Sequence, residues 1–113
     1  MELQIAAVND KGYLFKENLC LKVLKDCNLN EYMVLVKPAS SSEEGVYTSK
    51  KRYKFESVKV KKGDVIYLNT DEGVNRKKVN KKSASEFVFY WGLSDTIWGN
   101  KSYTPTLAKV EAE

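Results

Sequence analysis

The sequence predicts an all-β protein, built as an antiparallel sandwich or barrel of seven or eight short strands. Apolar and polar residues alternate through short runs, which is typical of strands that bury one face. Clusters of Asn, Asp, Gly and Lys separate these runs at intervals suited to turns. No stretch shows the apolar stripe of an amphipathic helix, so we expect strands throughout.

The chain length of 113 residues suits one domain, and we expect residues 1–113 to fold as a single unit. Hydrophobic residues make up 42% and aromatic residues 12%, which is typical of a globular protein. The N-terminus has no apolar segment of signal-peptide length behind a basic head, and no run approaches membrane-spanning length. We therefore expect an intracellular, cytoplasmic protein with no membrane segment, unless a leader has been removed.

Three strands are expected in the first third of the chain. Residues 2–7 and 17–24 alternate in hydrophobicity, and residues 31–37 are apolar on both faces, as in a central strand. Pro38 and the lack of a helical stripe argue against a helix at 31–37. The residues expected on the buried face of the first two strands are Leu3, Ile5, Ala7, Leu19, Leu21 and Val23.

The stretch at residues 53–69 predicts a hairpin, and a loop follows it. Its apolar alternation is broken at residues 61–64, where Gly63 suits a tight turn, and resumes at Val65. Residues 76–85 contain five basic residues and one apolar residue, so we expect an exposed loop there.

The C-terminal third begins with the most aromatic run of the chain, at residues 86–92. Alternation places Phe87, Phe89 and Trp91 on one face of an expected strand. A short strand or bend at residues 95–100 and a closing strand at residues 106–110 complete the expected framework.

The order of these features resembles the lamin tail domain family. That family has a mid-domain strand, turn and second strand similar to Val58-x-Val60-x-x-Gly63-Asp64-Val65-Ile66-Tyr67-Leu68. An acidic Gly-containing loop follows in the family, and Asn69-Thr70-Asp71-Glu72-Gly73 matches it. The family's two later tryptophan segments are matched by Phe89-Tyr90-Trp91 and Ile97-Trp98-Gly99-Asn100. Its closing leucine strand is matched by Thr106-Leu107-Ala108-Lys109-Val110, and Glu17-Asn18-Leu19-Cys20-Leu21 matches an early strand more loosely.

The resemblance covers roughly residues 2–110 and implies an immunoglobulin-like antiparallel β-sandwich. Members of the family bind proteins or nucleic acid, in nuclear lamins and as accessory modules of bacterial proteins, and the domain is not itself catalytic.

Basic residues are concentrated in the middle of the chain, although the formal net charge is only +4. Residues 50–82 contain twelve Lys or Arg against four Asp or Glu, a net charge of +8, whereas each flanking part has a net charge of −2. This distribution predicts one basic face or loop. The candidate binding residues are Lys50, Lys51, Arg52, Lys54, Arg76, Lys77, Lys78, Lys81 and Lys82.

Three interpretations of this basic band stay open. Its side chains could neutralise the phosphates of a nucleic acid, while the interleaved Tyr47, Tyr53 and Phe55 stack on bases. They could instead bind an acidic protein. The simplest interpretation is a solvated face whose lysines keep sheet edges from pairing with other chains.

The sequence offers few groups for redox or metal chemistry. Because it contains no histidine, the commonest general base and metal ligand are absent, and we expect no metal or other cofactor. Cys20 and Cys27 are expected to be free thiols rather than a redox pair, since no CxxC motif is present. Trp91 and Trp98 could line a ligand groove, but aromatic residues at this spacing more often form a core.

Four carboxylates fall in expected turns, where catalytic acids often lie: Asp64, Asp71, Glu72 and Asp95. No nucleophile–base pair or phosphate-binding Gly-rich loop accompanies them, so we predict that the protein is not an enzyme.

We therefore predict a non-enzymatic interaction module of lamin-tail type that binds a protein or nucleic acid through the two segments Lys50–Lys54 and Arg76–Lys82. One alternative is a structural or assembly domain that self-associates through its edge strands. Another is a nucleic-acid-binding barrel of OB or SH3 type.

Overall fold

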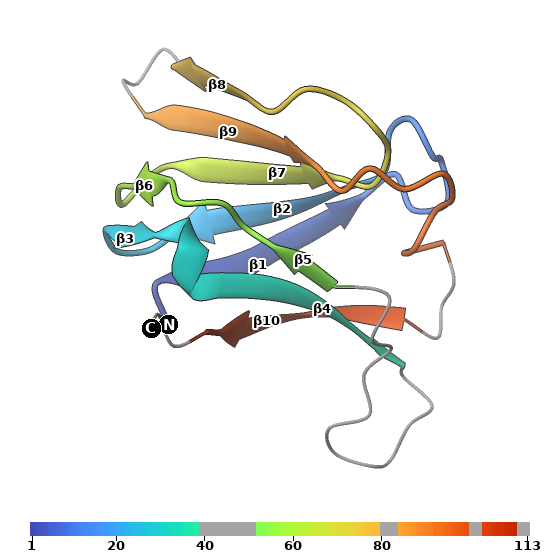
Figure 1. Ribbon diagram of the computed structural model, residues 1–113, viewed down its shortest axis with the longest axis horizontal. Coiled ribbons are helices and arrows are strands. Elements are labelled where there is room, and N and C mark those ends of the chain that lie inside the picture. The colour runs from blue at the N-terminus through green and yellow to red at the C-terminus, as the bar shows by residue number, and fades with distance from the viewer. Residues whose placement is uncertain (39–51, 80–83, 100–102, 111–113) are drawn as a thin grey trace.

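The computed structural model describes residues 1–38, 52–79, 84–99 and 103–110, which form an all-β protein (Figure 1). The predicted all-β class is confirmed. We expected seven or eight strands, and the described residues contain ten, two of which are only two residues long. The strands are β1 (Leu3–Asn9), β2 (Asn18–Val23), β3 (Cys27–Asn28), β4 (Tyr32–Pro38), β5 (Arg52–Lys54), β6 (Lys59–Val60), β7 (Val65–Asn69), β8 (Arg76–Val79), β9 (Ser85–Tyr90) and β10 (Tyr103–Lys109), with a 3-10 helix η1 (Leu29–Glu31) before β4.

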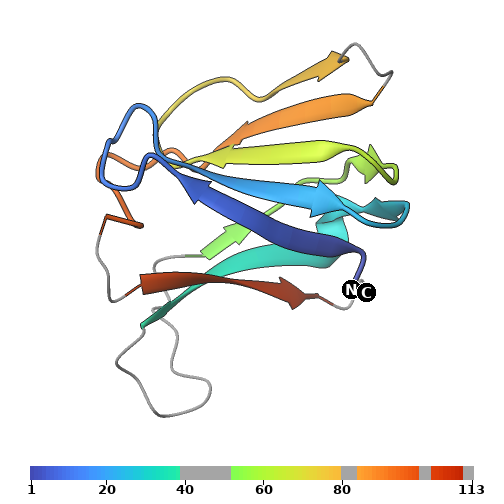
Figure 2. The same ribbon diagram turned by 180° about the vertical axis from the view of Figure 1, so that it is seen from behind.

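The two larger sheets lie over a common core (Figure 1, Figure 2). The five-stranded sheet has the order β1-β2-β7-β9-β8, and the three-stranded sheet has the order β10-β4-β5. β3 and β6 pair as a separate small ribbon. On one side β1 approaches β10, and an ion pair of 3.2 Å joins Glu2 Oε1 to Lys109 Nζ.

The core consists of alternate residues from both sheets, together with aromatic residues of the C-terminal third. In β2, Leu19 and Leu21 have no exposed surface, as their alternation predicts. Phe89 contacts Phe55 edge-to-face, with ring centroids 5.3 Å apart. Trp98 is buried in the core, and Trp91 is half-buried with its ring centroid 6.4 Å away. Burying one such large apolar side chain contributes about 1.5–3 kcal/mol.

One pair of strands runs parallel, whereas an antiparallel arrangement was expected. β9 lies between β7 and β8, pairing parallel with β7 and antiparallel with β8. The residue types explain this order. In β9, Phe87 and Phe89 on one face and Val88 on the other are all buried, so β9 takes a position with a neighbour on each side. β8 is exposed along its length and three of its four residues are basic, and it takes the edge.

The hairpin expected at residues 53–69 is not formed, although its turn is present. Gly63 has a φ of 96°, which glycine adopts readily. The strands on either side of this turn then separate: β6 pairs with β3, and β7 pairs with β2 and β9. The sequence shows the turn and both apolar runs, but it does not show which strand each run pairs with.

The buried face of β1 also differs from the strict alternation that we expected. Leu3 is buried, but the β1–β2 register shifts between Ile5 and Ala7. This irregularity exposes Ala7 and turns Val8 toward the core.

A buried carboxylate holds together the connections at one end of the sheets. Glu17 has no exposed surface, and its Oε1 accepts hydrogen bonds from the backbone N–H groups of Gly12 (3.0 Å) and Trp98 (3.1 Å). Its Oε2 accepts from the Ile97 N–H at 3.0 Å. The loop before β2 is thereby fixed to the segment that carries Trp98.

Candidate partner-binding surface

Among the described strands, β8 carries the largest number of exposed basic residues of the predicted band. All four of its residues are exposed, and three of them are basic. We expected an exposed loop at residues 76–85; residues 76–79 are exposed but form a strand, because an edge strand needs only backbone pairing with its neighbour. Asn75 starts this pairing by accepting a hydrogen bond from the Tyr90 N–H through Oδ1 at 2.9 Å.

The basic residues of β8 project from both faces of the sheet. Arg76 and Lys78 lie opposite Val88 and Glu86 in the register, on the outer face. Lys77 lies opposite Phe87, on the face toward the core, and its ammonium group lies 5.4 Å from the centroid of the Phe87 ring. This geometry is a cation–π contact.

A hollow of about 240 Å³ lies beside β8 on the core side of the sheet. Its apolar wall includes Val58, Phe87 and Phe89, and Arg76 and Lys77 stand at its border. A hydrogen bond of 3.2 Å from Asn75 Nδ2 to Glu56 Oε1 joins the two segments that bound it. The β8 surface therefore combines positive charge with a small apolar recess.

The other described basic candidates, Arg52 and Lys54, lie on the three-stranded sheet rather than on the sheet of β8. Arg52 and Lys54 pair with Leu35 and Met33, whose neighbours in β4 face the core, so both basic residues are on the outer face of the three-stranded sheet. Lys54 Nζ donates to the Asn30 carbonyl and, at 3.4 Å, to the Phe55 carbonyl.

The structure thus places Arg76 and Lys78 on the outer face of the five-stranded sheet and Lys77 on its core side, whereas Arg52 and Lys54 lie on the three-stranded sheet. The remaining candidates, Lys50, Lys51, Lys81 and Lys82, lie outside the described residues. Tyr53, considered as a base-stacking residue, instead packs on Phe55 and Trp91, with ring centroids 5.1 and 5.7 Å away.

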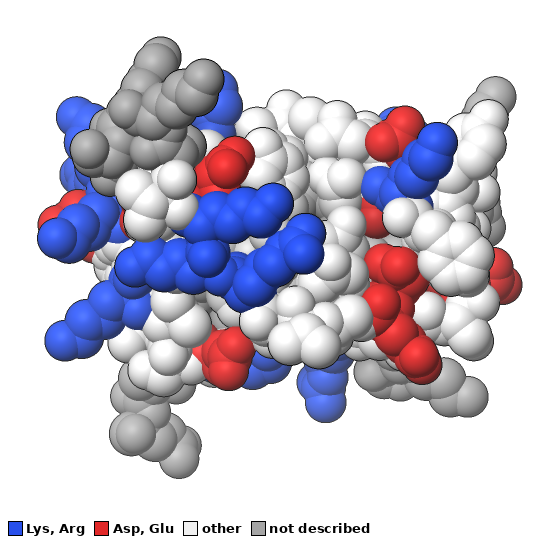
Figure 3. All heavy atoms as spheres, turned by 90° about the horizontal axis from the view of Figure 1, so that it is seen from above, with Lys and Arg blue, Asp and Glu red and all other residues white. Residues whose placement is uncertain are grey.

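Figure 3 looks onto the side of the molecule where β8 lies. Lys and Arg side chains gather over one part of this side, and carboxylates are more prominent toward the end that carries the β1–β2 and β7–β8 connections. At that end, a second hollow of about 390 Å³ is lined by Leu14, Phe15, Asp71, Glu72, Leu93 and Ser94.

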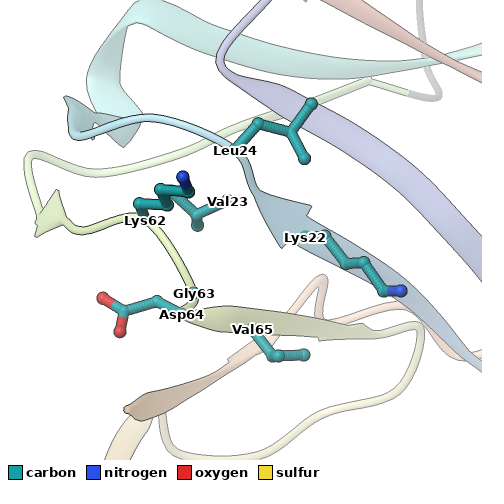
Figure 4. Close-up of a pocket in the computed structure, with 7 residues that line it drawn as sticks. All are labelled: Lys22, Val23, Leu24, Lys62, Gly63, Asp64 and Val65. Atoms are coloured by element: carbon teal, nitrogen blue, oxygen red, sulfur yellow. The ribbon is translucent and has the colours of Figure 1, made fainter.

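A third hollow, of about 280 Å³, lies where β2 meets the turn before β7 (Figure 4). Asp64 lines it, but its carboxylate points away from Lys22 in the figure. Both Asp64 oxygens accept backbone hydrogen bonds of 2.9 Å, from the N–H groups of Lys61 and Ser85. This candidate catalytic acid therefore fixes a turn to the start of β9.

The two cysteines are free thiols, as expected, and both are partly buried. Burial raises the pKa of Cys20 and of Cys27, so fewer of these groups are thiolates at neutral pH. Among the described residues, no group of three or more side chains is placed to hold a metal ion.

Two structural features of the site and core were missed in the sequence. Glu17 stands at the start of an apolar run, and nothing in the sequence distinguishes it from an exposed strand-end residue. The contact of Lys77 with Phe87 depends on the β8–β9 pairing, which the loop assigned to residues 76–85 excluded.

Comparison with known proteins assigns no family to the chain, so its class of protein is defined by the structure alone. No protein-family model matches the chain, and no curated protein matches it. Within the described part of the chain, no helix has the length and apolar character needed to cross a membrane. The chain is a small all-β protein with two facing sheets and a basic edge strand.

Proposed function

We propose that the protein is a non-enzymatic interaction module that binds an acidic partner through β8. Its fold is proposed to be the immunoglobulin-like sandwich of the lamin tail domain. Two sheets over a shared aromatic core, together with the order of motifs along the chain, support this fold.

One observation carries the proposal: the edge strand β8 exposes Arg76 and Lys78 on the outer face of its sheet and Lys77 on the other face. Among the described residues, no carboxylate lies within ion-pair distance of these three side chains. Their charges are therefore available to an anionic partner.

The distribution of charge favours an acidic protein over a nucleic acid. A nucleic acid held by the whole basic band would contact Arg52 and Arg76 together, but these residues lie on the outer faces of different sheets. The surface on β8 is short, and it suits a local acidic segment better than a long array of phosphates.

The two alternatives from the sequence have less support. Pairing of β8 with β8 of a second copy would place like charges against one another, which is unfavourable. An OB or SH3 barrel would require one closed sheet, whereas the strand order divides the chain into separate sheets.

The test measures binding of fluorescent poly-glutamate, duplex DNA and single-stranded RNA at low and moderate salt. We expect poly-glutamate to bind, with an affinity that falls as salt rises. The double variant Arg76→Glu/Lys78→Glu should bind at least about tenfold more weakly, while the matched control Arg52→Glu binds as the unaltered protein does.

Equal binding of poly-glutamate by the double variant, or no binding by the unaltered protein, would overturn the proposal. If DNA or RNA binds more tightly than poly-glutamate and Arg52→Glu weakens that binding, the partner is a nucleic acid.

A further inference from the structure

The free edge of β8 has the geometry needed to accept another strand. β8 is the last strand of its sheet, and among the described strands only β9 pairs with it. In an antiparallel pair, alternate residues direct their N–H and C=O groups toward the neighbouring strand, and the residues between direct theirs away. β8 therefore presents backbone donors and acceptors along its outer edge, where its side chains are also exposed.

The charges of β8 select the kind of strand that it can accept. An added strand would place its own side chains beside those of β8 on both faces of the sheet. On the outer face these neighbours are Arg76 and Lys78, and Glu86 on β9 is the nearest carboxylate in the register. Acidic residues at alternate positions of the added strand would match the two positive charges.

The core side of the sheet determines which residues of the added strand can lie between its acidic residues. There, Lys77 lies over the Phe87 ring, and the hollow beside it is lined by the apolar residues Val58, Phe87 and Phe89 together with Glu56. A volume of about 240 Å³ is enough for a medium-sized apolar side chain. The added strand should therefore alternate acidic and apolar residues.

We propose that β8 is extended by a strand from a partner protein, an extended peptide in which acidic residues alternate with apolar ones. Its acidic residues lie beside Arg76 and Lys78, one of its apolar side chains enters the hollow, and its backbone pairs with the free edge of β8. This inference rests on the proposed function, because it specifies how the acidic partner binds to the same strand.

The test uses short synthetic peptides of alternating glutamate and valine, and backbone N-methylation separates strand pairing from charge. One peptide carries N-methyl groups on its odd-numbered amides and a second carries them on its even-numbered amides. A bound strand directs only one of these two sets toward β8, so one methylated peptide should lose at least about tenfold in affinity and the other should bind nearly as the parent does. A glutamate–serine peptide tests the apolar recess and should bind more weakly than the glutamate–valine peptide.

The double variant Arg76→Glu/Lys78→Glu again tests the binding surface, and Arg52→Glu is again the matched control. Circular dichroism checks that each variant is folded. If both methylated peptides bind as well as the parent and the double variant still loses binding, charge-based recognition stands and strand addition is refuted. If the parent peptide and poly-glutamate both fail to bind the unaltered protein, strand addition and the proposed function are both refuted. If only nucleic acid binds, both protein-partner proposals are overturned.

Discussion

Glu17 and Thr70 are joined by two hydrogen bonds, although 53 positions separate them in the sequence. The Thr70 hydroxyl donates to Glu17 Oε2 at 2.6 Å, and the Thr70 N–H donates to the Glu17 carbonyl at 3.2 Å. Both residues are buried. With the three backbone donors described above, the Glu17 carboxylate accepts four hydrogen bonds, and it joins three connections at one end of the molecule.

The first prediction is that Glu17→Gln destabilises the fold. The glutamine amide has one oxygen and one NH₂ group, so its NH₂ would face hydrogen-bond donors that the carboxylate now satisfies. We expect the free energy of unfolding to fall by about 2–4 kcal/mol, measured by urea denaturation. The control Glu72→Gln alters an exposed carboxylate and should change stability by no more than about 0.5 kcal/mol. Equal stability of both variants would show that the Glu17 hydrogen bonds do not hold the fold.

The second prediction concerns Gly73, which leads into β8. A Cβ atom at this position would lie 2.5 Å from Tyr90 Cζ and 2.6 Å from Tyr90 Cδ1, closer than carbon atoms approach. Gly73→Ala should therefore destabilise the protein by about 1–3 kcal/mol, because the Tyr90 ring has to move. In a Tyr90→Ala background the same substitution should cost much less. A double-mutant cycle measures this coupling, and simple additivity of the two substitutions would contradict the contact.

The third prediction is a loss of stability in alkali that depends on Tyr32. Burial, followed by the hydrogen bond with Glu2, raises the pKa of the Tyr32 phenol from 10.0 to about 12. Above pH 10 the unfolded chain loses this proton while the folded chain keeps it, so the free energy of unfolding falls as pH rises from 10 toward about 12.

The variant Tyr32→Phe keeps the buried ring and removes the titrating group. Its stability, measured by urea denaturation across this pH range, should decline less steeply than that of the unaltered protein. Some decline should persist, because burial also raises the pKa of Tyr53 and of Tyr67. Identical slopes for the two proteins would contradict the assignment to Tyr32.

Much of the framework follows from local patterns in the sequence. Leu19, Leu21 and Val23 alternate along β2, and all three are buried as expected. The apolar run at residues 31–37 becomes β4, in the middle of the three-stranded sheet. The aromatic run expected as a strand at residues 86–92 contributes to β9, which ends at Tyr90, so Trp91 lies beyond the strand. In β2 the alternation indicates which face is buried, and in the other two segments the apolar run indicates a strand with apolar residues on both faces.

The pairing of strands and the shape of the site could not be predicted from local patterns of hydrophobicity. Gly63 marks a turn, but whether its flanking strands pair depends on contacts with β2, β3 and β9, which are distant in the sequence. The basic residues appear as one band in the sequence, yet Arg52 and Arg76 lie on different sheets. Net charge in a window of sequence reports proximity along the chain, and only the sheet topology determines which side chains share a face.

The most direct test of the account is to map the backbone amide NMR shifts of the protein during titration with the glutamate–valine peptide. We expect the largest changes at Arg76–Val79, with smaller changes at Phe87 and Val58 beside the hollow, and none at Arg52 or Lys54. Changes concentrated at β5, or at Phe15 and Leu93 at the far end of the molecule, would show that β8 is not the binding surface.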